Sequence, residues 1–256
     1  MLQAHSFLWK YLWIAPNIFL LALAVVLWKR GIWRRFPAFL VFSVVGALVD
    51  LAVYAADVLP SVSAVNFWRV EWASIVIESV LKFIVIGELF SRVVSPYPSV
   101  SRLGRIFVSG GGAALVFVAT LVAALSRGDS TVRLVSGFHL LAQTAYLVEL
   151  GLVVIIFLFA AYFGLSWDRI SFGVMLGFGV SACEYLASWA IVANADPSAQ
   201  GRTLLDLMDM ATYHLCVLFW CYYLLVPGKV RAKTTVSLPA HNLDVWNREL
   251  ERLLQQ

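Results

Sequence analysis

The most polar of the long apolar segments in this sequence is VIESVLKFIVIGELF, at positions 76–90. It holds Glu78 and Lys82 four residues apart, with Glu71 seven residues before Glu78. Residues at these steps share one face of an α helix, and a glutamate four residues before a lysine is in the favourable pairing order. The sequence therefore predicts an ion pair between Glu78 and Lys82 within one helix.

Other apolar segments carry polar side chains on similar helical stripes. The clearest stripe combines Gly173, Gly177 and Ser181 with Glu184, and its small residues would let another helix approach closely around the carboxyl group. Ionisable residues in a membrane helix are costly unless they face a bundle interior or a water-filled cavity. The candidates for a ligand- or ion-binding site are Asp50, Glu78, Lys82, His139, Gln143, Glu184, Asp209 and His214.

The deep charges of this group do not balance. Lys82 is the only base among the deeper groups, whereas the acids are Asp50, Glu78, Glu149, Glu184 and Asp209. The surplus carboxyls must be protonated, hydrogen-bonded, or matched by a cation, a proton in transit or a cationic ligand. The alternative is that they remain protonated and only join helices.

A cofactor cannot be assigned from these residues. His139 and His214, with Asp209 and Glu184, allow a haem or a metal ion in principle, but one histidine pair on two helices is weak support. The sequence contains no P-loop, HExxH, serine nucleophile elbow or Rossmann fingerprint. An enzyme is accordingly the least favoured class, and nothing points to nucleic acid as a partner.

Composition places these stripes in a membrane. Of 256 residues 61% are hydrophobic and 13% are charged, and the mean hydropathy is +0.84, which is outside the usual range of soluble proteins. A membrane-spanning helix needs roughly 20 apolar residues. Seven segments approach this length, at Leu12–Trp28, Pro37–Ala56, Trp68–Leu89, Ile106–Leu125, Leu134–Phe163, Ile170–Val192 and Leu204–Val226. The predicted fold is all-α, a polytopic bundle of seven transmembrane helices.

Lysine and arginine in the short connections set the predicted orientation. Eleven of them follow the first, third, fifth and seventh segments, whereas five lie at the N-terminus and in the other connections. Because positive charge favours the cytoplasmic side, the N-terminus is expected outside and the C-terminus in the cytoplasm. Glu88 then lies near a cytoplasmic helix end, where we expect it to meet Arg92.

The chain divides into a transmembrane domain, residues 1–228, and a cytoplasmic tail, residues 229–256. Leu243, Trp246, Leu250 and Leu253 recur at helical spacing, which predicts a short amphipathic helix over residues 241–256. This helix is expected either to lie on the membrane surface or to dock a protein partner.

The leading functional hypothesis is an integral membrane protein, of a bacterial inner membrane, whose carboxylate-rich pocket opens outward. It would bind a small molecule or cation and act as a sensor-like or accessory subunit, because the sequence holds no output domain of its own. A small transporter or proton-coupled carrier is the first alternative. A structural subunit of a membrane complex is the second. The comparison with rhodopsins and receptors fails, because the seventh segment has no lysine for retinal and the receptor motifs are missing.

Overall fold

The computed structural model describes residues 6–93, 110, 130–162, 167–195, 198–226, 248 and 251–252, and the side chains of these except for residues 130–138. Every long element in these ranges is an α helix, which confirms the all-α class for the described chain. The helices are α1 (Phe7–Lys29), α2 (Pro37–Val58), α3 (Ala64–Val93), α5 (Ser130–Tyr162), α6 (Arg169–Ala195) and α7 (Ala199–Leu225), with a short 3-10 helix, η1 (Ile32–Arg34), before α2.

Five of these helices are long and apolar enough to cross a membrane, as expected for a multi-pass membrane protein. They are α1, α2, the part of α5 from His139 to Tyr162, α6 and α7. The third expected span, Trp68–Leu89, forms most of α3 but is not among the five, because Glu71, Glu78, Lys82 and Glu88 lower its hydropathy. The fourth expected span lies outside the described residues, as does nearly all of the tail. The count of seven, the orientation and the tail helix therefore stay predictions.

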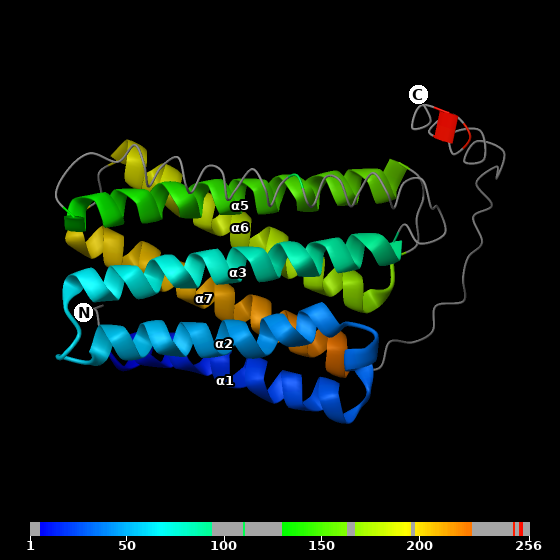
Figure 1. Ribbon diagram of the computed structural model, residues 1–256, viewed down its shortest axis with the longest axis horizontal. Coiled ribbons are helices and arrows are strands. Elements are labelled where there is room, and N and C mark those ends of the chain that lie inside the picture. Colours follow the sequence, from blue (N-terminus) through cyan, green and yellow to red (C-terminus); the bar gives the residue numbers. More distant parts are fainter. Residues whose placement is uncertain are drawn as a thin grey trace.

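The helices form a closed ring. In sequence order each described helix packs against the next, from α1 through α2, α3, α5 and α6 to α7, and α7 returns to α1. Figure 1 shows them running alongside one another, with the starts of α1, α3, α5 and α7 at the same end as the finishes of α2 and α6. Asp50 on α2 is thereby placed across the ring from α6, and Glu78 on α3 across from α7.

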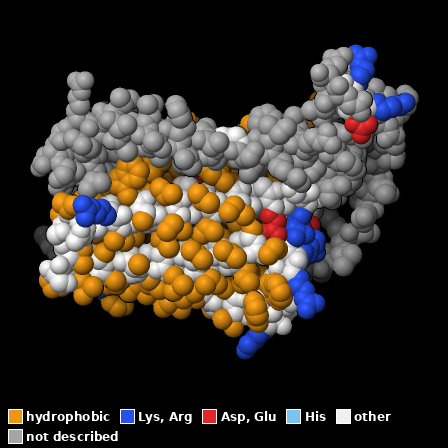
Figure 2. Space-filling model, viewed as in Figure 1, with side chains coloured by type: hydrophobic (Ala, Val, Ile, Leu, Met, Phe, Trp, Pro, Cys, Tyr) orange, Lys and Arg blue, Asp and Glu red, His pale blue; other side chains and the backbone are white. Residues whose placement is uncertain are grey.

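Hydrophobic side chains cover the outside of the ring. In Figure 2 they spread over the middle of the described face, while lysine, arginine and acidic side chains lie toward its ends. Large apolar side chains such as Ile18, Leu48, Ile84 and Leu147 are half or more exposed. Such an exposed apolar belt is the surface that a lipid bilayer would cover.

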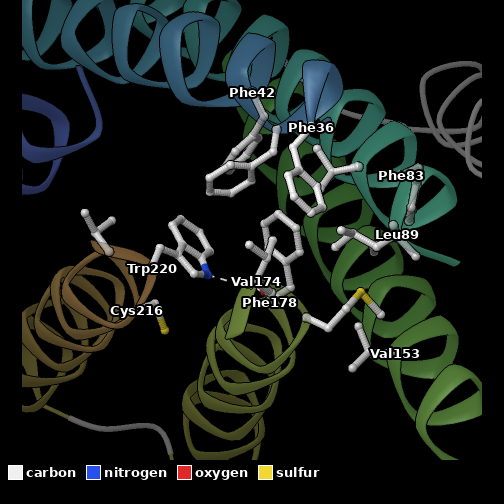
Figure 3. Packing of buried hydrophobic residues seen from close by; sticks show 14 of the residues in the cluster. Phe36, Phe42, Phe83, Leu89, Val153, Val174, Phe178, Cys216 and Trp220 are labelled. Carbon is white, nitrogen blue, oxygen red and sulfur yellow. Dashed lines mark hydrogen bonds between the residues drawn. The ribbon is translucent and has the colours of Figure 1, made fainter. Parts of the chain in front are cut away.

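An aromatic cluster fills the interior of the helix bundle between α2, α6 and α7 (Figure 3). The rings of Phe42, Phe178 and Trp220 lie 5.2–5.8 Å apart in edge-to-face arrangements. The Trp220 indole donates a hydrogen bond of 3.3 Å to the Val174 carbonyl, so its polar edge is satisfied. α7 reaches α6 this closely because position 177 is glycine; a Cβ there would overlap the Trp220 indole. The predicted small-residue face of the sixth span is thus used for close helix packing.

Candidate functional site

A pocket of about 250 Å³ lies inside the ring, and all six described α helices contribute to its lining. Its charged side chains are Asp50, Glu78, Lys82, Glu184 and Asp209. Asp50 lies eight residues before the end of α2, and Asp209 ten residues after the start of α7, so both belong to the same end of the bundle. Phe42, Phe178 and Trp220 come about two to three turns further from that end than the acids on their own helices, and there the aromatic cluster closes the ring of helices.

The structure brings together five of the eight candidate residues and places the other three elsewhere. His214 packs between the rings of Tyr11 and Phe19 on α1, at 5.6 and 5.7 Å. His139 packs against Trp68 and Trp189, at 6.2 and 5.0 Å. Gln143 is half-buried on α5 and is not part of the pocket lining.

The hypothesis of a haem or metal ion between the two histidines gains no support from this placement. Within the described residues, no group of three or more His, Cys, Asp or Glu side chains is arranged to hold a metal ion. Both histidines lie among aromatic rings rather than beside the pocket carboxyls. Their packing therefore assigns them to contacts between helices.

Lys82 forms an ion pair across two helices. Its Nζ lies 3.4 Å from Glu149 Oε2 on α5, and both side chains are at least nine-tenths buried. The same ammonium lies 4.4 Å from the centre of the Tyr146 ring, which adds a cation–π contact. The predicted ion pair between Glu78 and Lys82 is wrong, because Lys82 pairs with Glu149 on the neighbouring helix α5 instead of with Glu78 on its own helix. Glu78 accepts a hydrogen bond from Ser74, at 3.3 Å.

The remaining carboxyls of the pocket form two pairs. Asp50 and Glu78 are close enough to interact electrostatically, and so are Glu184 and Asp209. Ser188 donates to Glu184 at 2.8 Å, whereas the buried Asp209 Oδ1 receives no hydrogen bond from a donor group. Two ionised carboxylates at such range repel, by about 4 kcal/mol at 4 Å in a partly polar surrounding. Each pair must therefore share a proton or take up a cation.

Aromatic side chains form most of the remaining wall. Tyr146 and Tyr185 are stacked, with ring centres 4.0 Å apart, and Trp13 and Tyr213 also line the pocket. Trp13 and Tyr185 were not among the predicted site residues, because neither lies in a stripe of polar residues. The only signal in the sequence is that Tyr185 directly follows Glu184. Aromatic faces beside carboxyl groups can hold an organic cation, because the ring quadrupole and the carboxylate both attract positive charge.

A second polar region, the arginine end, lies at the opposite end of the bundle, where α2 and α6 begin. Arg35 pairs with Asp168 at 3.3 Å, and Arg92 pairs with Glu88 at 3.2 Å, as the sequence predicted. Asp168 also accepts hydrogen bonds from the backbone at the start of α6. Glu88 accepts one from the Ala38 N–H at the start of α2, at 3.0 Å. These acids satisfy helix starts that would otherwise hold unpaired N–H groups.

Two further arginines close the end of α7. Arg30 donates to the Leu225 carbonyl at 3.2 Å, and Arg169 donates to the Val226 carbonyl at 2.9 Å. Cations are favoured at the C-terminus of a helix, where carbonyl groups lack helical donors. The arginine end therefore joins the ends of α1, α2, α3, α6 and α7 through ion pairs and hydrogen bonds within the chain.

Comparison with known proteins assigns no relative. No family model, no curated protein and no solved structure matches this chain. A functional proposal must therefore rest on the geometry of the pocket.

Proposed function

We propose that the pocket between the helices binds a small cationic ligand. The observation that carries this proposal is the charge of the lining: Lys82 is already paired with Glu149, and four carboxyls remain. A positive ligand would replace the electrostatic compensation that the described chain does not supply there. The aromatic wall favours an organic ammonium over a bare metal ion.

We further propose that the protein works as a sensor-like or accessory subunit of a bacterial inner membrane. The aromatic cluster favours ligand binding over ligand transport, because it fills the interior of the helix bundle between the pocket and the arginine end. A signal from the pocket would need a partner protein, for which the cytoplasmic tail is the proposed docking segment. The proposal includes the seven-helix topology, with the N-terminus outside and the C-terminus in the cytoplasm.

A small transporter or proton-coupled carrier is the second candidate. It is favoured by one observation, namely that every described α helix contributes to the pocket lining, so that a tilt of any helix would change access to it. For transport the aromatic cluster around Trp220 would have to open. A structural subunit of a membrane complex is the third candidate, in which the carboxyl pairs would hold protons and only join helices.

Thermal unfolding of the purified full-length protein tests cation binding. The probes are 1-aminobutane and tetramethylammonium, compared with the uncharged 1-butanol. We expect the cations to raise the unfolding temperature of the native protein but not of a variant combining Asp50→Asn, Glu78→Gln, Glu184→Gln and Asp209→Asn. Glu251→Gln is the control, because Glu251 is exposed and lies in the tail, outside the pocket. Equal behaviour of cations and alcohol would refute the proposal.

A flux measurement separates the first two candidates. The protein is reconstituted in vesicles, and uptake of radiolabelled 1-aminobutane and acidification of the lumen are followed. Binding without flux supports the sensor-like role. Flux that disappears in Glu78→Gln but persists in Glu251→Gln supports the transporter.

A further inference from the structure

The two carboxyl pairs lie on opposite walls of the pocket. Asp50 and Glu78 come from α2 and α3, which pack against each other. Glu184 and Asp209 come from α6 and α7, which also pack against each other. In the closed ring, α1 separates α2 from α7, and α5 separates α3 from α6 over most of their length. The pocket therefore carries acid on two facing sides instead of in a single cluster.

The charge of each wall follows from its pairing. If each pair shares one proton, each wall keeps one negative charge, because only one of its two carboxyls is then ionised. Lys82 is the one basic side chain of the lining that the structure describes; Glu149 is its ion-pair partner, and the lysine also interacts electrostatically with Asp50 and Glu78. Two negative charges on opposite walls remain. A ligand with a single positive charge can compensate only one of them.

The surface between the two walls is suited to a hydrocarbon chain. Leu12 on α1 contributes aliphatic surface, and Trp13 on α1 and Tyr146 on α5 contribute aromatic faces. Among the described lining residues, this middle section has no acid that could bind a charge halfway between the walls. The arrangement of donors also disfavours a divalent metal, since no described group of three or more acidic, histidine or cysteine side chains is close enough to coordinate one.

We propose that the ligand of this pocket is a short linear diamine with one ammonium group on each carboxyl pair. Each ammonium has three N–H donors and can bond both carboxyls of a wall, while the methylene chain lies along the aromatic middle. This inference rests on the proposed cation binding and adds the class of ligand. A pocket of about 250 Å³ has room for such a molecule, because one water occupies only about 30 Å³ of liquid volume.

The test compares three probes on the native full-length protein by calorimetric titration. They are 1,4-diaminobutane, 1-aminobutane and 1,4-butanediol, which differ in the number of charges but little in length. We expect 1,4-diaminobutane to bind at least about tenfold more tightly than 1-aminobutane, because its second charged hydrogen bond is formed out of water. The diol is expected not to bind.

Variants locate the two charges. Two double variants each remove the acids of one wall: Asp50→Asn with Glu78→Gln, and Glu184→Gln with Asp209→Asn. Either one should reduce the affinity for 1,4-diaminobutane to within about twofold of that for 1-aminobutane. Binding of 1-aminobutane should persist through the other wall. Asp206→Asn is the matched control, because Asp206 is exposed on α7 only three residues before Asp209.

The outcomes distinguish this inference from the proposed function. Equal affinity of the native protein for the mono- and diamine overturns the diamine and leaves a cation pocket. The diamine is also overturned if removal of one wall abolishes binding of both amines while removal of the other changes neither. If neither amine binds, both proposals fail. Because the decisive comparison uses the native protein, it stands even if a double variant does not fold.

Discussion

The pocket and the arginine end contain the same kinds of charged side chain in different arrangements. At the arginine end, Asp168 and Glu88 each have an arginine and a helix N-terminus as partners. In the pocket, Asp50 faces Glu78 and a second acid pair lies opposite. Partners of opposite charge indicate a structural role. Acids that face other acids indicate a binding site for a positive charge that the described chain does not supply.

The largest change in stability is expected at Lys82, the pocket residue that already has an ion-pair partner of opposite charge. Lys82→Met leaves Glu149 buried without its cation, and removal of one partner of a buried pair costs about 3–5 kcal/mol of unfolding free energy. Denaturation in mixed micelles measures this loss. Lys82→Met with Glu149→Leu should recover most of it, and an equal loss in the double variant would contradict the pairing.

At the arginine end, the largest loss is expected from Asp168. Asp168→Ala removes the acceptor at the start of α6 and the partner of Arg35. Loss of such a helix cap costs about 1–2 kcal/mol. Asp168→Asn keeps an oxygen acceptor and should lose less in the same denaturation measurement. Equal losses would mean that the ion pair, and not the cap, carries the effect.

The pocket should respond with the opposite sign when one of its surplus acids is neutralised. Asp209→Asn removes the acid–acid contact with Glu184 and supplies an amide donor, so the protein without ligand should be stabilised by about 1 kcal/mol. Thermal unfolding without amine measures this gain, with Asp206→Asn as the control. A clear loss of stability would show that Asp209 serves the fold itself.

The smallest effect is expected for Arg35. Its ion pair with Asp168 is largely exposed, with 58% of the arginine side chain accessible. Exposed pairs contribute about 0–1 kcal/mol and are screened by salt. Arg35→Gln should therefore change the unfolding free energy by less than about 1 kcal/mol, and the change should shrink in high salt. A larger effect independent of salt would mean that this end is as tightly coupled as the pocket.

The sequence predicted the helices better than their mutual arrangement. Apolar length identified the six segments that the structure describes as α helices, and spacing along one helix identified the Glu88–Arg92 pair and the close-packing glycines of α6. Helical spacing also allowed Lys82 to pair with Glu78. Its actual partner, Glu149, depends on which helix packs against α3, and spacing along one helix does not predict this. For the same reason His139 and His214, although polar and at a suitable depth, lie among aromatic rings outside the pocket.

Helix α3 belongs to both polar regions. Lys82 and Glu88 are six residues apart, about 9 Å along the axis of one continuous helix. In the pocket, α3 contributes Glu78. At the arginine end, its Glu88 accepts a hydrogen bond from the Ala38 N–H in the first turn of α2. A rotation of α3 that moved Glu78 toward a ligand would also pull Glu88 from that turn. Under the proposed ligand binding, occupation of the pocket would therefore also change the contact between Glu88 and the Ala38 N–H at the arginine end.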